Sequence, residues 1–390
     1  MMTSEILSVV IPQTLFGAGA TAKLGELVRD FSPTNILIVT DPGVERAGLV
    51  ETVKAPLSAA GFKPNVFSKC GVEAPASIIE ELRDLIVTGK YDLLIGVGGG
   101  SVMDTTKAAS VLAANSGLTL QDLLEFRPAG ASVKKILIPT TSGTGSEWSS
   151  AAVVTLDAVD GRTYPYFTPR NYPDAVIIDP ELTRNLPARA TAHTGMDALT
   201  HAIEAYTCCR ASVVSDMFAV AAIKLIAESL RPAFAKGSCD MEHRYKLAMA
   251  ASAAMAAGSV AGVGIAHFMN HGLARKAHTS HGSTVALMLP YVMEFNLVSN
   301  PAKFAEVARL LGEETYGLSV MDAAQESAVA VRRLLNDLEM PQTLTEVGVT
   351  EADIPELVDE LMTYQSFPIA FMNPRDVSAE DAAAIYMSAL

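Results

Sequence analysis

Cysteine, tryptophan and charged residues are scarce in this sequence of 390 residues. It has four cysteines, one tryptophan and seven histidines, and charged residues make up only 18% of it. The cysteines, Cys70, Cys208, Cys209 and Cys239, show neither CxxC spacing nor disulfide density. This pattern excludes a disulfide scaffold and a cysteine-based structural zinc site, and it favours a reducing, cytoplasmic setting.

Positive charge is also in short supply. The chain has 29 lysines and arginines against 43 aspartates and glutamates, which gives a formal net charge of −14. Non-specific binding to nucleic acid or to an anionic membrane depends on basic charge, so we expect neither kind of partner. Hydrophobic residues make up 49% of the chain, which excludes intrinsic disorder, and the length predicts two domains.

One long stretch, from Leu247 to Ala274, contains no Asp, Glu, Lys or Arg. It is long enough to cross a bilayer. However, it consists mostly of Ala, Gly, Ser and Met, with two His and one Asn, so its insertion into lipid would be unfavourable. We interpret it as a buried helix in a helical layer. The first ten residues, MMTSEILSVV, lack the basic and apolar segments of a signal peptide, and none is expected.

The first half of the chain alternates apolar runs, typical of buried parallel strands, with helical segments. The expected strands are 36–40, 93–97, 136–139 and 175–178, and the expected helices include 78–87 and 102–113. This alternation predicts a doubly wound α/β domain. After about Pro187, Ala, Leu, Met and Glu recur at helical spacing. We therefore expect an α/β domain over residues 1–186 and an all-α domain over residues 187–390.

Two glycine-rich loops follow predicted strands of the first domain. The first lies between a strand and a helix, where free backbone N–H groups can bind a phosphate. The second, in the segment IPTTSGTGSE, interleaves hydroxyl side chains with glycines. Each loop alone could equally be an ordinary turn, but two of them at strand ends of one sheet favour a dinucleotide. The candidate cofactor residues of the loops are Gly98, Gly99, Gly100, Ser101, Thr140, Thr141 and Thr144.

An acidic residue ends the first of the expected strands. Asp41 is followed by Pro42 and Gly43. At a strand end, a carboxylate can accept a hydrogen bond from a ribose 2′-hydroxyl and repel a 2′-phosphate, so Asp41 favours NAD(H) over NADP(H). The commoner role of Asp in such a sequence is to cap a helix or a turn, and this alternative stays open.

Histidines gather in the second domain. Asp197 and His201 are four residues apart and share a helix face, so they can bind one divalent ion. A second segment holds four histidines within fifteen residues: His267, His271, His278 and His281. One carboxylate with several imidazoles suits Fe²⁺, Zn²⁺, Mn²⁺ or Co²⁺ better than Ca²⁺ or Mg²⁺. The pattern alone does not say which of the four histidines bind the ion.

Several motifs together resemble one known family. They are GGGSVMDTTKA, IPTTSGTGSE, AVIIDPELT, TGMDALTHAIEAY, AHFMNHGLARKAHTSHG and NPRDVSAEDAAAIY, and they run in order along nearly the whole chain. They resemble the iron-containing (group III) alcohol dehydrogenases. The resemblance implies a dehydroquinate-synthase-like fold and metal-assisted hydride transfer between NAD(H) and a small alcohol, aldehyde or ketone. It also implies a homodimer or a larger homo-oligomer.

The resemblance also implies roles for individual residues. The implied metal ligands are Asp197, His201, His267 and His281. His271 would be a catalytic residue near the nicotinamide. Gly98–Ser101 would hold the pyrophosphate, the threonines of the second loop would contact the nucleotide, and Asp41 would bind the adenosine ribose. The family pattern does not require His278, which we expect behind the ligands or at the surface.

Two departures from the family pattern concern the cofactor and substrate regions. The stretch from Gly161 to Tyr166 has Arg162 but no Lys, where family members usually carry a Lys that contacts the cofactor ribose. Trp148 stands where a smaller residue is usual. The sequence selects neither the metal nor the substrate. The alternative functions are a glycerol-dehydrogenase-like polyol dehydrogenase and a metal-dependent phosphoesterase that uses the phosphate cradle.

Overall fold

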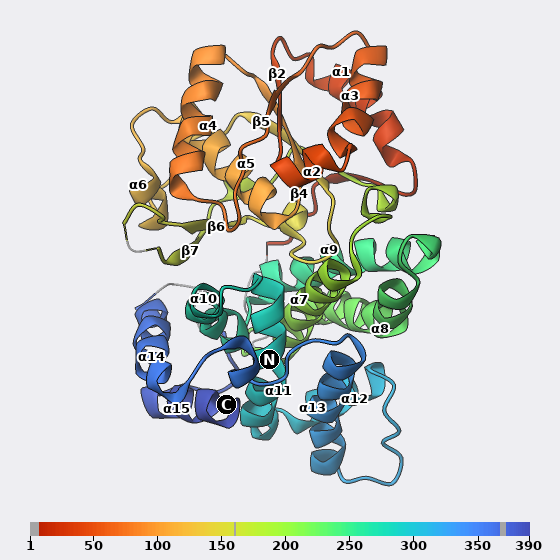
Figure 1. Cartoon of the computed structure of the whole chain (residues 1–390), viewed down its shortest axis with the longest axis vertical. Coiled ribbons are helices and arrows are strands. Elements are labelled where there is room, and N and C mark those ends of the chain that lie inside the picture. The colour runs from red at the N-terminus through yellow and green to blue at the C-terminus, as the bar shows by residue number, and fades with distance from the viewer. Residues whose placement is uncertain (1–7, 160, 367–371) are drawn as a thin grey trace. The chain divides into compact units, whose positions relative to one another are not determined.

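The computed structural model describes residues 8–159, 161–366 and 372–390, which form two compact units (Figure 1). The first unit is Val10–Asn185. The second unit is Leu186–Leu390, together with the described residues before Val10. Each unit has its own apolar core, and each is described by itself below.

The first unit is built around a six-stranded parallel sheet with the strand order β1-β8-β5-β4-β2-β3. A separate antiparallel hairpin pairs β6 with β7. The strands are β1 (Gln13–Phe16), β2 (Ile36–Val39), β3 (Asn65–Phe67), β4 (Leu93–Gly98), β5 (Lys134–Pro139), β6 (Ala151–Thr155), β7 (Thr163–Phe167) and β8 (Ala175–Ile178). The four strands expected from their apolar runs are β2, β4, β5 and β8, and all four are confirmed.

Helices cover both faces of this sheet. On β2, Leu37 and Val39 belong to an apolar core shared with α4 and α5, whereas Ile36 and Ile38 belong to a core shared with α1 and α3. Successive side chains of a strand point to opposite faces, so the two cores lie on opposite sides of the sheet. The doubly wound α/β architecture is therefore confirmed. The helices of this unit are α1 (Leu24–Phe31), α2 (Pro42–Arg46), α3 (Leu49–Ala59), α4 (Ala76–Gly89), α5 (Gly100–Ala114) and α6 (Leu120–Leu124).

In the second unit, the regular elements of the described residues are all helical. The α-helices are α7 (Ala188–Thr207), α8 (Val213–Lys236), α9 (Met241–Ala261), α10 (Ile265–Ala277), α11 (His281–Asn296), α12 (Pro301–Leu310), α13 (Val320–Asp337), α14 (Ile354–Thr363) and α15 (Ala379–Ser388). Alanine, leucine and isoleucine side chains from α7, α8 and α9 fill the centre of one apolar core. The predicted helical region is confirmed.

The uncharged stretch is not one helix, which corrects the expectation from its composition. Helix α9 ends at Ala261, and α10 begins at Ile265 with a bend of 113° between the two axes. Gly262 takes a φ of +87°, a left-handed conformation that side chains with a Cβ rarely adopt. Within the described residues, no single helix is long and apolar enough to cross a membrane, and α9 and α10 meet that test only as a bent pair.

Candidate metal centre and cofactor loops

Helix α7 presents a row of three polar side chains. Asp197, His201 and Glu204 follow the spacing i, i+4 and i+7, which a helix of about 3.6 residues per turn places on one face. All three are buried, with at most 6% of each residue exposed. The predicted placement of Asp197 and His201 on one helix face is confirmed.

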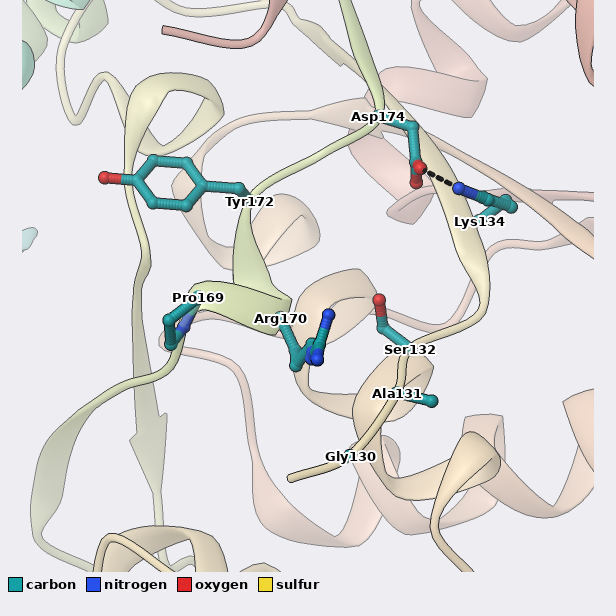
Figure 2. A pocket seen from close by; sticks show the side chains of 8 residues that line it. All are labelled: Gly130, Ala131, Ser132, Lys134, Pro169, Arg170, Tyr172 and Asp174. Atoms are coloured by element: carbon teal, nitrogen blue, oxygen red, sulfur yellow. Dashed lines mark hydrogen bonds and ion pairs between the residues drawn. The ribbon is translucent and has the colours of Figure 1, made fainter. Parts of the chain in front are cut away.

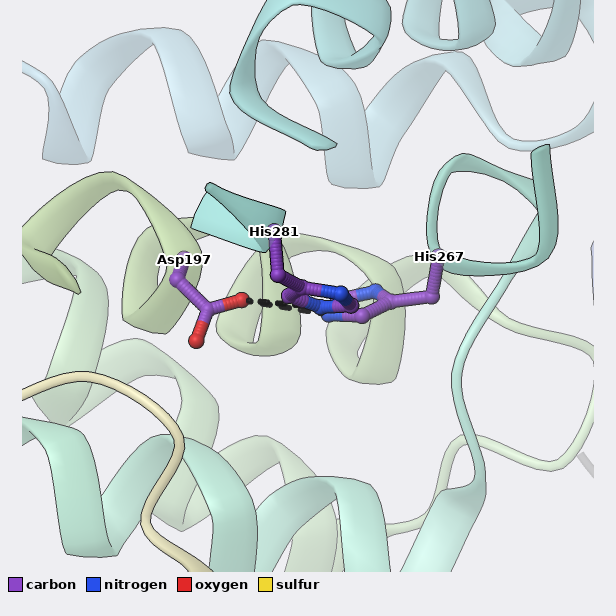
Figure 3. Close-up of side chains that lie close together, drawn as sticks. All are labelled: Asp197, His267 and His281. Carbon is purple, nitrogen blue, oxygen red and sulfur yellow. Dashed lines mark ion pairs between the residues drawn. The ribbon is translucent and has the colours of Figure 1, made fainter. Parts of the chain in front are cut away.

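Helices α10 and α11 bring two histidines to the carboxylate of Asp197 (Figure 3). The Nε2 atoms of His267 and His281 both lie 3.6 Å from Asp197 Oδ1. His201 Nδ1 lies 3.9 Å from the same oxygen. One ligand atom from each of Asp197, His267 and His281 falls within 4.8 Å of the others. The structure thus brings together the four side chains that the family resemblance names as ligands.

Three of these converging atoms have no hydrogen-bond partner. They are Asp197 Oδ1, His201 Nδ1 and His267 Nε2, and each is buried. A buried polar atom without a partner is costly. A divalent cation would satisfy all three, and one carboxylate oxygen with imidazole nitrogens is a donor set that suits Fe²⁺, Zn²⁺ or Mn²⁺. The residues present therefore fit a metal ion.

Burial and mutual proximity set the charges in this cluster. Burial, reinforced by the charge of His267, lowers the pKa of His201 to about 3. Burial acts in the same direction on His267, but the carboxylates of Glu204 and Asp197 outweigh it and raise the pKa of His267 to about 9. Burial would raise the pKa of Asp197, but the neighbouring histidines outweigh it and hold that pKa below its ordinary value. Asp197 is therefore anionic, as metal binding requires.

His271 lies one helical turn beyond His267 and is set apart from the converging atoms. Its ring centroid is 6.3 Å from that of His281 and 5.1 Å from that of Tyr364. Burial, followed by the charges of His281 and His267, lowers the pKa of His271 to about 3, so its ring is neutral at pH 7. His278 is exposed and ends α10 with a φ of +48°. Of the two places expected for His278, the structure shows the surface.

Sequence reasoning missed the side chains that hold the histidines in place. A hydrogen bond of 2.5 Å joins Glu204 Oε2 to His267 Nδ1. The side-chain amide of Asn270 lies 2.6 Å from His281 Nδ1. The only signal in the sequence was the position of Glu204, seven residues after Asp197 in the motif TGMDALTHAIEAY.

The two glycine-rich loops of the first unit lie against each other. They follow β4 and β5, which pair directly, and Thr140 N donates to Gly98 O at 3.0 Å. A Cβ on Gly100 would stand 2.7 Å from Thr144 Cγ2, so only glycine allows this close approach. Helix α5 begins at Gly100, where its first N–H groups have no partner within the helix. The loops thus form one region at the carboxyl ends of the strands, where open α/β sheets bind nucleotides.

A buried ionic network ties the second loop to α5. Lys107 Nζ donates to Ser146 Oγ at 2.6 Å and to Ala151 O at 2.8 Å. Ser146 Oγ donates to Asp104 Oδ1 at 2.5 Å, and Asp104 Oδ2 accepts from Val153 N at 3.0 Å. Lys107 is 0% exposed, and burial lowers its pKa. The network fixes the loop that ends at Ser146 against the helix and the β6 strand.

Two other residues singled out in the sequence have structural partners. Asp41 caps α2, since its Oδ1 accepts from Gly43 N at 2.6 Å and from Val44 N at 3.0 Å. The capping role that the sequence left open is therefore present, and Oδ2 takes no part in these two bonds. Trp148 is 7% exposed, and its Nε1 donates to Thr14 Oγ1 at 3.0 Å, so it anchors the loop to the strand β1.

A cavity of about 300 Å³ lies elsewhere in the first unit (Figure 2). Its lining includes Lys134, at the start of β5, and Asp174, just before β8, which form an ion pair at 2.6 Å. None of the predicted cofactor residues lines it. The cavity lies at the amino ends of β5 and β8, whereas the glycine-rich loops follow the carboxyl ends of the strands. This cavity is therefore separate from the candidate cofactor site.

Two family models match the chain. The iron-containing alcohol dehydrogenase model matches residues 12–180, and the model of the C-terminal part of the Fe-containing alcohol dehydrogenase family matches residues 191–390. Together they cover both units.

Individual relatives match along nearly their whole length. A long-chain-alcohol dehydrogenase of Geobacillus thermodenitrificans is 37% identical over 97% of this chain and 95% of its own. An NAD-dependent methanol dehydrogenase of Bacillus methanolicus is 36% identical over 97% of this chain and 98% of its own. The structure of an alcohol dehydrogenase from Oenococcus oeni has a TM-score of 0.93 and 32% identity, covering 99% of this chain and 100% of that one. The chain therefore belongs to the iron-containing alcohol dehydrogenase family and is an oxidoreductase of that family.

Proposed function

We propose that this chain transfers hydride between NAD(H) and a small alcohol, aldehyde or ketone, and that it depends on a divalent metal. The proposed ligands are Asp197, His201, His267 and His281. The convergence of these side chains carries the proposal, because three of their atoms have no hydrogen-bond partner. The family description favours Fe²⁺, with Zn²⁺ and Mn²⁺ as alternatives.

We assign NAD(H) to the first unit and the metal to the second. Gly98–Ser101 and the threonines of the second loop would bind the dinucleotide through backbone amides and hydroxyls, since a chain with a net charge of −14 cannot rely on bulk positive charge. The similarity to an NAD-dependent methanol dehydrogenase supports NAD(H) as the cofactor. Asp41 at the end of β2 supports NAD(H) over NADP(H).

In the proposed reaction, the carbinol C–H bond breaks with its electron pair, the O–H proton leaves, and a carbonyl forms. When bound at Asp197, His201, His267 and His281, the metal would supply a Lewis acid for the alcohol oxygen, and a dinucleotide held by the loops would supply the hydride acceptor. The chain supplies the rest. Asp197, His201 and His267 are buried, which limits the access of water to this side of the cluster. His271, close to the cluster but outside the ligand set, would pass the released proton on to water or orient the group that takes it, since its lowered pKa does not let the ring keep the proton.

The proposal is tested on full-length chain that has been stripped of metal with a chelator. We expect NADH-linked reduction of small aldehydes to disappear on stripping and to return with Fe²⁺, Zn²⁺ or Mn²⁺. His267→Ala should bind the metal far more weakly and lose activity, whereas His271→Ala should lose activity but keep the wild-type metal affinity. Full NAD-linked alcohol oxidation by the metal-free chain, or by His267→Ala, would show that the proposal is wrong.

Two further properties stay predictions. A reducing, cytoplasmic setting is expected from the cysteine pattern. A homodimer or larger homo-oligomer is expected from the family resemblance, and light scattering of the purified chain measures it.

A further inference from the structure

Glu204 is a buried carboxylate that joins two helices of the second unit. It lies on α7 and is only 4% exposed. Its Oε1 accepts a hydrogen bond from Ala266 N at 2.7 Å, and its Oε2 lies 2.5 Å from His267 Nδ1. Ala266 is the second residue of α10, and the first N–H groups of a helix have no partner within the helix. One carboxylate therefore both caps α10 and holds the ring of His267.

The local sequence makes room for this carboxylate. A Cβ on Gly264, the residue before α10, would stand 2.8 Å from Glu204 Oε1 and 3.1 Å from its Cδ. Any larger residue at this position would push the carboxylate away from the start of α10. The bend between α9 and α10 and the glycine after it thus serve the same contact.

We propose that Glu204 is a positioning residue of the metal centre, which holds the ring of His267 by its Nδ1 atom and so aims the Nε2 atom at Asp197. This inference rests on the proposed function, since it takes His267 as a ligand. An imidazole that binds a metal is neutral and carries one N–H, and the hydrogen bond to one ring nitrogen determines which nitrogen that is. A carboxylate oxygen accepts, so the contact with Glu204 keeps the proton on Nδ1 and leaves Nε2 as the nitrogen that can bind the metal. The same Nε2 is 3.6 Å from Asp197 Oδ1 and has no hydrogen-bond partner.

Both hydrogen bonds of Glu204 use a side-chain oxygen as the acceptor. A glutamine has the same shape but only one such oxygen. In Glu204→Gln, one oxygen becomes an NH₂ group. If this group faces Ala266 N, two donors meet and the cap is lost. If it faces His267 Nδ1, that nitrogen must accept, and the ring proton moves to Nε2, where the metal should bind. One orientation therefore loses the cap of α10, and the other moves the ring proton of His267 to the nitrogen that should bind the metal.

The test measures the affinity of the metal-stripped, full-length chain for Co²⁺ by titration of its visible absorption. We expect the Kd for Co²⁺ to rise by about 10–100-fold in Glu204→Gln, since partners behind metal ligands typically contribute that much. The control is Glu360→Gln, which alters another buried carboxylate of this unit, bound to Arg275 and 1% exposed. The control should keep the wild-type Kd and absorption spectrum.

A double variant separates an effect on His267 from a general effect on the fold. In the His267→Ala background, Glu204→Gln should cause no further loss of Co²⁺ affinity. If the losses add, or if Glu204→Gln alone binds Co²⁺ as the wild type does, the inference is wrong. If the wild-type chain itself fails to bind Co²⁺, the proposed function is wrong instead.

A second variant covers the case in which Glu204→Gln does not fold, as judged by circular dichroism. Glu204→Asp keeps both acceptor oxygens on a side chain one methylene shorter, so it cannot reach Ala266 N and His267 Nδ1 together. We expect it to weaken Co²⁺ binding and to shift the absorption spectrum. Unchanged affinity in a folded Glu204→Asp variant would also overturn the inference.

Discussion

Replacing Gly282 with alanine should disturb the metal centre through packing alone. Gly282 is the second residue of α11 and follows His281. A Cβ there would stand 2.3 Å from the backbone oxygen of His193 on α7, more than 1 Å inside ordinary contact, which begins at 3.4 Å. The obstacle is a backbone carbonyl, which cannot rotate away as a side chain can. The start of α11 must therefore move away from α7.

The size of this movement sets the expected effect. Overpacking of this kind costs about 1–3 kcal/mol of unfolding free energy. The metal centre is more sensitive, because Asp197 lies on α7 and His281 on α11, and metal–ligand distances tolerate only about 0.2 Å. The bond of 2.6 Å between His193 Nδ1 and Ser280 Oγ, which joins the same two elements, would stretch as well. We expect the Kd for Co²⁺ to rise roughly tenfold or more.

Two measurements check this reasoning, namely urea unfolding of the metal-free chain and titration with Co²⁺. The control is Gly258→Ala on α9, where a Cβ would make only ordinary contacts, the nearest at 3.5 Å. It should keep the wild-type Kd and gain up to about 1 kcal/mol, because alanine favours a helix more than glycine does. Wild-type stability and affinity in Gly282→Ala would refute the packing argument.

Three further predictions concern the first unit. Lys107→Met leaves the buried carboxylate of Asp104 without its cation, so the free energy of unfolding should fall by about 3–5 kcal/mol. NADH should also bind more weakly in a fluorescence titration. Adding Asp104→Asn should restore part of the stability and part of the affinity for NADH. Burial lowers the pKa of Lys135 from 10.5 to about 7. The folded chain therefore releases this proton at lower pH than the unfolded chain, and urea unfolding should show the stability of the wild type, relative to Lys135→Met, rising from pH 7 to 10.5. Asp41→Ala removes two capping bonds, so the free energy of unfolding should fall by about 1 kcal/mol, and the preference in kcat/KM for NADH over NADPH should shrink; an unchanged preference would make Asp41 a cap only.

The buried strands could be predicted from the sequence, and the edge strands could not. β2 and β8 are buried along their whole length, so each reads as an unbroken apolar run. β1 and β3 are the two edges of the sheet and are mostly exposed or half-buried. A strand of three or four residues with one solvent-exposed side shows neither an apolar run nor a clear alternation. Its pairing partner, rather than its own residues, makes it a strand.

The break between α9 and α10 could not be predicted from the sequence, for a related reason. Glycine often marks the end of a helix, but this stretch has Gly258, Gly262 and Gly264 among alanines and serines. Gly258 lies inside α9, whereas Gly262 takes a left-handed φ and Gly264 an extended one. Composition cannot tell these glycines apart. The choice depends on what each one packs against, which for Gly264 is Glu204 on α7.

The candidate site, too, could be predicted only in part from the sequence. Spacing along one helix was enough to place Asp197 and His201 on a common face, because helix geometry is local. Spacing could not choose among the later histidines, since that choice depends on how α10 and α11 approach α7. The structure brings Nε2 of His267 and His281 to Asp197 and leaves His271 one turn away.

The absence of charge between Leu247 and Ala274 also has an electrostatic consequence for this cluster. The ionic groups that face His267 are then Asp197 and Glu204, both from α7. In a buried environment of low dielectric, a further carboxylate would compete to hold the ring, and a lysine would take the place that suits a divalent cation. The part of α10 before Arg275 adds no charge that competes with these two carboxylates. Asp197 faces the converging nitrogens, and Glu204 holds the ring that supplies one of them.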